Sequence, residues 1–184
     1  MQQVYLLCSH VLFIIMGGVL MFNVGEYVVY KRDVCKIKEI KKNGFNNKDY
    51  YVLIPIDDNT LKIDVPMDNT NNLLRPIIEK NDVDSIIDSI INIPIINTEN
   101  KLIENEYRQL LNSGRHEDLI KVIKTTYLRN KERTDMGKKI GDKDDLYFKR
   151  AEQLLYNEFS IALNMNYDDT KKYVIDAVTA IDNN

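Results

Sequence analysis

The chain has 184 residues, of which 44% are apolar, with two cysteines and a formal net charge of −3. Its length and apolar content allow one ordinary domain or two small ones, and its charge excludes a protein that coats DNA through an overall basic field. Cys8 and Cys35 form no CxxC pair and only two histidines accompany them, so we expect a reduced, cytoplasmic chain without a metal site or cofactor.

Most of residues 1–20 belongs to a run without charged residues from Val4 to Phe22. A run of this length could span a bilayer or form the core of a signal peptide, yet no Lys or Arg precedes it, as a signal peptide requires. Gly17-Gly18-Val19 can be encoded by GGAGGTG, a ribosome-binding sequence, just upstream of a start codon for Met21. A membrane segment and a translated leader are therefore the two interpretations. The codon argument favours the leader, and we expect no membrane partner.

Residues 21–79 are predicted to form a β domain, because short apolar segments alternate with turn residues such as Asn43-Gly44. The almost unbroken apolar run at Tyr50–Pro55 indicates a strand that is buried on both faces. The expected strands are Phe22–Tyr30, Val34–Lys41, Tyr50–Pro55, Leu61–Pro66 and Leu73–Pro76. Five short strands at this spacing fit a small, strongly bent barrel of Tudor or SH3 type.

The strand that ends at Pro66 is predicted to lie at an edge of this barrel, because proline cannot donate a hydrogen bond to a neighbouring strand. An edge strand can accept a strand of another chain, with the outward side chains of Lys62 and Asp64 supplying selectivity. Alternatively, these two charges only keep an exposed edge from aggregating.

Residues 80–184 are predicted to form about five amphipathic helices, because apolar residues recur there at helical spacing. We expect Asn81 or Asp82 to cap the first helix and Ser113-Gly114 to end the second. Among the inward side chains we include Ile91 and Tyr127. The expected helices cover Val83–Ile91, Ile103–Leu111, Glu117–Asn130, Lys143–Leu163 and a last segment that follows Asp168-Asp169. The whole chain is thus predicted to be of the α+β class.

Basic residues are concentrated between Lys121 and Arg150, where ten of them accompany five acidic residues. If the segment Arg129 to Lys139 forms one surface, it could neutralise several DNA phosphates and bind DNA without sequence preference. The alternative is an ordinary solvated helix end and loop. The candidate DNA-binding residues are Lys101, Arg108, Arg129, Lys131, Arg133, Lys138 and Lys139.

The sequence contains no recognisable catalytic constellation. His10 and His116 have no nucleophile in a matching pattern, and the segment Gly137 to Gly141 lacks the rest of a phosphate-binding loop. We therefore expect neither an enzyme nor a protein with a small-molecule substrate.

A set of segments in the β domain recurs in the order that one known family shows. These segments are Phe22-x-Val-Gly-Glu-x-Val-Val-Tyr30, Tyr51-Val-Leu53, Leu61-x-Ile-x-Val-Pro66 and Arg75. They resemble the RNA polymerase-interacting domain of the CarD/CdnL bacterial transcription regulators, which also occurs in the transcription-repair coupling factor. The resemblance implies a Tudor-like barrel that adds one strand to the β-subunit lobe of RNA polymerase. The residues implied in that contact are Leu61, Lys62, Ile63, Asp64, Val65 and Pro66.

Two positions depart from the family pattern. The family usually continues Pro-x-His-Gly after Tyr30, whereas this chain has Lys31-Arg-Asp-Val34, and Asp64 stands where some members carry a basic residue. The charge match with the polymerase is therefore expected to differ from that of those members.

The resemblance continues into the helical half. The segments Leu110–Gly114, Leu119–Ile123, Lys131–Arg133 and Arg150–Leu155 are similar in order to the family's C-terminal domain. In the family, that domain touches promoter DNA and stabilises the open complex with a Trp wedge and a basic run. This chain has no Trp, and its aligned run Asn100–Glu106 lacks the basic charge. We expect a regulator that binds RNA polymerase and promoter DNA, or alternatively an adaptor that binds a protein without DNA.

Overall fold

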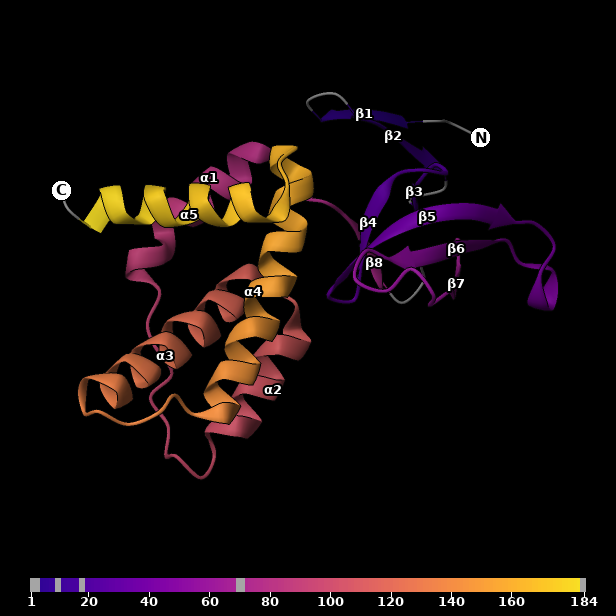
Figure 1. The fold of residues 1–184 in the computed structure, drawn as a ribbon. Coiled ribbons are helices and arrows are strands. Elements are labelled where there is room, and N and C mark those ends of the chain that lie inside the picture. Colours follow the sequence, from indigo (N-terminus) through magenta and orange to yellow (C-terminus); the bar gives the residue numbers. More distant parts are fainter. Residues whose placement is uncertain (1–3, 9–10, 17–18, 69–71, 183–184) are drawn as a thin grey trace. The chain divides into compact units, whose positions relative to one another are not determined.

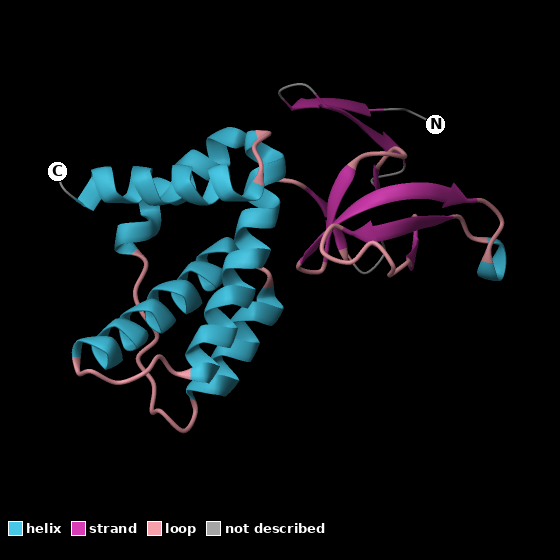
Figure 2. Cartoon of the chain, in the orientation of Figure 1, coloured by secondary structure: helices cyan, strands magenta, loops and turns pink. Residues whose placement is uncertain are grey.

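The computed structural model describes residues 4–8, 11–16, 19–68 and 72–182 of the chain (Figure 1). It divides into two compact units, Met1–Ile77 and Ile78–Asn184. The first contains the strands and the second contains the α-helices (Figure 2). The predicted α+β class is therefore confirmed.

The N-terminal apolar run forms strands in the part of it that the structure describes. The strands β1 (Val4–Cys8), β2 (Val11–Met16) and β3 (Val19–Met21) pair antiparallel in that order. Among the helices of the described residues, none is both long and apolar enough to cross a membrane. The choice of a translated leader for residues 1–20 stays a prediction.

A separate five-stranded antiparallel sheet follows. Its strands are β4 (Tyr27–Tyr30), β5 (Asp33–Lys41), β6 (Tyr50–Pro55), β7 (Ile63–Pro66) and β8 (Leu74–Pro76), and a short 3₁₀ helix, η1 (Phe45–Asn47), lies in the β5–β6 loop. The spatial order is β7-β6-β5-β4-β8. The prediction of five strands is confirmed, and so is the Tudor-like class.

Two of the strands begin later than predicted because side chains hold the preceding residues in turns. Before β4, Asn23 donates its backbone N–H to the Glu26 carboxylate at 2.9 Å, and Gly25 has a φ of 93°. Before β7, the Asp58 carboxylate accepts the backbone N–H of Thr60 at 2.9 Å and its hydroxyl at 2.6 Å. The predictions that strands begin at Phe22 and Leu61 are therefore wrong.

One face of the sheet carries the core of this unit. Tyr51, Val52 and Leu53 of β6 are all completely buried, which confirms the prediction that this strand is covered on both faces. Within the core, the Tyr51 hydroxyl accepts the backbone N–H of Phe22 at 2.9 Å. The buried cluster consists of Phe22, Val28, Cys35, Ile37, Tyr51, Leu53, Val65 and Leu74.

The second unit contains five α-helices in its described residues. They are α1 (Lys80–Ser89), α2 (Ile103–Ser113), α3 (His116–Asp135), α4 (Asp142–Leu163) and α5 (Tyr167–Asp182), with a 3₁₀ turn η2 (Ile90–Asn92) after α1. The long helices α3 and α4 lie side by side (Figure 1). Apolar side chains from all five helices form one core, with Tyr107 and Phe159 among the largest buried residues.

The helix boundaries differ from the predicted ones at two places. Glu79 caps α1 in place of Asn81 or Asp82, because Glu79 and Asp82 exchange side-chain and backbone hydrogen bonds in a capping box. Helix α3 continues past Asn130 to Asp135, where Gly137 with a φ of 70° follows. The predicted end of α2 at Gly114 is confirmed, since this residue has a left-handed φ of 65°.

Two predicted core residues are exposed. Ile91 is 44% exposed because α1 ends at Ser89 and the following 3₁₀ turn changes the direction of the side chains. Tyr127 is 56% exposed, whereas Thr125 and Thr126 just before it are buried, because successive residues of a helix point about 100° apart.

A buried ionisable pair links α3 and α4. The Glu158 carboxylate lies 2.8 Å from Nε2 of His116 and also accepts the backbone N–H of Ile78 at 3.2 Å. Its side chain is 4% exposed, so it joins the first residue of the helical unit to the core.

Candidate interaction surfaces

The strand β7 forms one border of the sheet and, among the described residues, pairs only with β6. Tyr51 lies opposite Val65, and the backbone N–H of Met67 reaches the carbonyl of Asp49 at 2.9 Å. Backbone groups alternate in direction along a strand, so those of Asp64 and Pro66 point away from the sheet. The backbone nitrogen of Pro66, which carries no hydrogen, therefore lies on the open side of the strand, where β6 needs no donor. This border, from Ile63 to Pro66, is called the β7 edge below.

The predicted contact residues around the β7 edge lie in different environments. Leu61 and Lys62 precede the strand and are exposed, whereas Val65 is 3% exposed and belongs to the core. Asp64 is exposed, and Nζ of Lys41 donates hydrogen bonds to its carboxylate, at 3.1 Å to Oδ1 and 2.9 Å to Oδ2. An exposed ion pair contributes little to stability, but it offsets the negative charge at the position where the sequence departs from some members of the resembled family.

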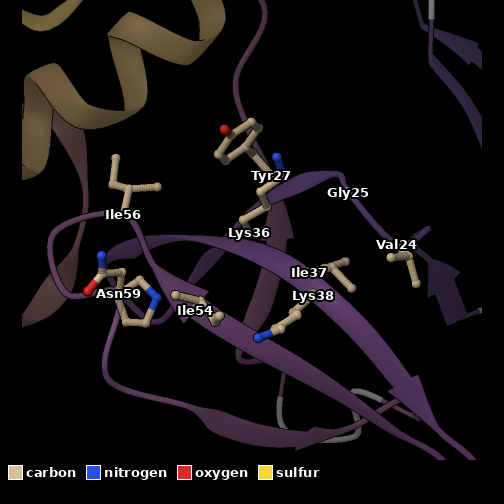
Figure 3. Close-up of a pocket in the computed structure, with 10 residues that line it drawn as sticks. Val24, Gly25, Tyr27, Lys36, Ile37, Lys38, Ile54, Ile56 and Asn59 are labelled. Carbon is tan, nitrogen blue, oxygen red and sulfur yellow. The ribbon is translucent and has the colours of Figure 1, made fainter.

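An open groove lies on the face of the sheet opposite the core (Figure 3). Its volume is about 560 Å³. Tyr27 of β4, Lys36 of β5 and Ile54 of β6 lie opposite one another in register and form a row across it. The Lys36 ammonium lies 5.3 Å from the centre of the Tyr27 ring, a cation–π distance. This hollow is called the Tyr27 groove below.

The sequence-based prediction missed the Tyr27 groove. Its residues are spread over 24–59 and come together through the strand register. One signal was present, because Lys36 interrupts an apolar segment and therefore had to point away from the core.

The loop between α3 and α4 carries two of the predicted DNA-binding residues, Lys138 and Lys139. Arg133 donates from Nε to the carbonyl of Lys139 at 2.9 Å, and the backbone N–H of Gly141 is bound by the Asn130 side chain at 2.9 Å. Residues 131–140 are all exposed. The structure thus brings Lys131, Arg133, Lys138 and Lys139 together along the end of α3 and the following loop, which we call the α3–α4 basic loop.

Of the other three predicted cations, Arg108 and Arg129 are held by neighbours within the helical unit. Arg129 donates to the Asp144 carboxylate at 3.1 Å and to the Asn100 side chain at 2.8 Å. The Asn100 contact brings the exposed Lys101 alongside α3. Arg108 is 2.6 Å from Glu104, so its charge is offset on its own helix.

No metal site is found in the part of the chain that the structure describes, since no group of three or more His, Cys, Asp or Glu side chains converges there. His116 is paired with Glu158 and stacks at 5.8 Å on Phe159.

A protein-family model matches part of the chain. The model of the CarD-like/TRCF RID domain matches residues 22–78, which are the segment that contains the sheet from β4 to β8. No curated protein matches the chain. The helices α1 to α5 lie outside the matched residues. Residues 22–78, which carry the β7 edge and the Tyr27 groove, thus form a domain that matches the CarD-like/TRCF RID family.

Proposed function

We propose that this protein is a transcription regulator that binds RNA polymerase by adding β7 to a strand of the polymerase β subunit. The observation that carries the proposal is the β7 edge, which lies inside the matched RID domain and whose outward backbone groups at Asp64 and Pro66 face no second strand among the described residues. Strand addition gives affinity through backbone hydrogen bonds and selectivity through alternate side chains. The RID domain itself implies RNA polymerase as the partner.

The second part of the proposal concerns promoter DNA. The α3–α4 basic loop presents exposed lysines that can bind phosphates and place the helical unit on DNA during initiation. Regulation of open-complex stability would follow from binding the polymerase and the template at the same time. The binding groups described here suggest a binding module without catalytic activity.

An adaptor without DNA binding is the second candidate. It is favoured by two observations: the chain has no Trp, and Arg108 and Arg129 are engaged by carboxylates of their own unit. On this account the helical unit binds another protein or has no partner.

A pull-down of RNA polymerase from the source cell tests the shared claim. The wild-type chain should retain the polymerase, and Ile63→Arg should lose it, because a bulky charge at the β7 edge blocks an added strand. Circular dichroism of the variant is needed, since Ile63 also packs against the core. Retention by a folded Ile63→Arg would contradict docking at this edge.

The lifetime of promoter open complexes separates the two candidates. A regulator changes the lifetime when the wild-type chain is added, whereas an adaptor without DNA contact leaves it unchanged even though it binds the polymerase.

A further inference from the structure

The Tyr27 groove and the β7 edge belong to one sheet. Tyr27, Lys36 and Ile54 are cross-strand neighbours on β4, β5 and β6. Leu53, the residue before Ile54 on β6, lies opposite Ile63, the first residue of β7. The row of three side chains therefore ends one residue along β6 from the pair at which β7 begins.

The positive charge of the groove is not balanced by carboxylates that line it. Lys36 and Lys38 line the groove, and none of the residues that line it is Asp or Glu. Within the described residues, no ion pair joins either lysine to a carboxylate. Asp64 lies on the same face, but it is already paired with Lys41 at 2.9 Å. Lys36 and Lys38 would therefore attract an occupant that carries an acidic group.

The floor of the groove is apolar. Val24 is 55% exposed and Ile56 is 37% exposed, and Ile54 lies between them on β6 (Figure 3). Burial of these side chains by a partner contributes free energy in proportion to the apolar area covered. A suitable occupant thus combines an acidic side chain with an apolar one.

A polypeptide fits this chemistry better than a nucleic acid does. Residues 22–78 contain nine basic and eight acidic residues, which gives a net charge of only +1. Binding of nucleic acid depends mainly on several phosphate contacts, and the exposed aliphatic floor offers none. Among the described residues that line the groove, Tyr27 is the only aromatic side chain on which a base could stack.

We propose that the Tyr27 groove binds an acidic, partly apolar peptide segment of RNA polymerase, so that the polymerase occupies both this groove and the β7 edge. This inference rests on the proposed function. Both surfaces are assigned to one partner because they lie on adjacent strands of one sheet, β6 and β7, inside the matched domain.

Equilibrium binding of the full chain to core RNA polymerase tests the inference. Lys36→Glu should raise the Kd about tenfold, because the reversed charge repels the acidic segment, and the Kd of this variant should depend less on salt. Lys42→Glu is the matched control. Lys42 is also an exposed lysine, it follows β5 directly and it does not line the groove, so its reversal should change the Kd less than about twofold.

The outcomes separate the inference from the function on which it rests. If Lys36→Glu behaves like Lys42→Glu while a β7-edge variant loses binding, the groove proposal is overturned and strand addition stands. If the wild-type chain does not bind RNA polymerase, both are overturned. Lys36 is exposed, so the variant should fold, and Lys38→Glu provides a second test of the same charge.

A photo-crosslink identifies the occupant directly. With benzoylphenylalanine in place of Tyr27, irradiation of the complex should join the groove to a polymerase peptide that contains Asp or Glu. Crosslinks to DNA, to a second copy of this chain, or to a polymerase segment without acidic residues would overturn the proposal.

Discussion

The thiol of Cys35 shows how burial controls chemistry at a single residue. Its side chain is fully buried in the core of the sheet. Burial raises the pKa of Cys35 to about 12, and the negative charges of Asp33 and Asp57 add to the effect. The nucleophile in thiol chemistry is the thiolate, so Cys35 is expected to be inert while the sheet is folded.

Reaction with a thiol reagent at pH 8 checks this expectation in a Cys8→Ser variant, so that Cys35 alone reports. Folded protein should react about a hundredfold or more slowly than protein in denaturant. Equal rates in the two states would show that Cys35 is accessible.

The same pKa shift predicts a dependence of stability on pH. An unfolded thiol ionises near its ordinary value of 9.0, whereas the folded one resists ionisation until about 12. The contribution of Cys35 is therefore fully present below about pH 9 and is lost as the pH rises toward 12. Urea unfolding between pH 8 and pH 10.5 should show wild type losing more stability than Cys35→Ala. Parallel curves would contradict the assignment.

Glu158 makes a prediction for the helical unit. Its carboxylate is bound by His116 and by the N–H of Ile78, and Glu158→Ala would leave both groups without this partner. We expect a loss of about 1–3 kcal/mol in the free energy of unfolding. Glu117→Ala is the control, because Glu117 forms an exposed pair with Lys121 and should cost less than about 1 kcal/mol. Equal effects of the two substitutions in urea unfolding would contradict this role.

Among the helices, α2 ends at Gly114 because this residue adopts a left-handed backbone conformation. It ends α2 with a φ of 65°, a region in which an L side chain is strained by about 1–2 kcal/mol. Gly114→Ala should therefore destabilise the protein by about 1 kcal/mol.

Gly141 provides the matched glycine. Its φ is −80°, and the nearest atom to an added Cβ would be at an ordinary contact distance of 3.5 Å. Gly141→Ala should cost no more than about 0.5 kcal/mol. Thermal unfolding compares the two variants, and a larger effect at Gly141 would contradict this account of the α2 boundary.

The spacing of apolar residues predicted the strands and helices themselves, but it predicted their ends less well. The alternation of apolar residues located five strands, and the Pro66 argument placed β7 at a border. The starts of β4 and β7 depend instead on side-chain hydrogen bonds such as that of Glu26 with Asn23, for which apolar spacing carries no signal. The exposure of Tyr127 depends likewise on which face of α3 packs against its neighbours.

The candidate site was predictable only in part for the same reason. The β7 edge is one contiguous segment, so the sequence could locate it. The Tyr27 groove and the Lys41–Asp64 pair depend on register across three strands, and a β-bulge between Ile37 and Glu39 shifts that register. One extra residue exchanges the face on which each later side chain lies, so the groove required the structure.

At the scale of the whole molecule, the two units have separate cores. The buried cluster of the sheet contains residues from Phe22 to Leu74, whereas that of the helices contains residues from Val83 to Val174. A fragment of residues 78–184 should therefore fold by itself with a cooperative unfolding transition and a helical circular dichroism spectrum. A fragment without cooperative unfolding would show that the helical core depends on the first unit.

On the proposed function the two units have different partners, since the helical unit contacts DNA while the sheet unit binds RNA polymerase. Reversal of Lys138 and Lys139 to Glu should weaken binding of the full chain to forked promoter DNA, with a smaller salt dependence. Reversal of Lys143, whose ammonium is 2.6 Å from Glu104, is the control and should have less effect. Unchanged affinity of the double variant at low salt would contradict a DNA contact at the α3–α4 basic loop.

The central claim is that the outward backbone of β7 binds RNA polymerase, and position 64 allows this backbone to be tested apart from its side chain. Asp64→Pro removes the outward N–H, whereas Asp64→Asn removes only the charge that pairs with Lys41. The most direct measurement is the Kd of core RNA polymerase for the wild-type chain and these two variants, with circular dichroism to verify folding. The account predicts at least about a tenfold loss for Asp64→Pro and less than about a threefold change for Asp64→Asn. Wild-type affinity in a folded Asp64→Pro variant would contradict it.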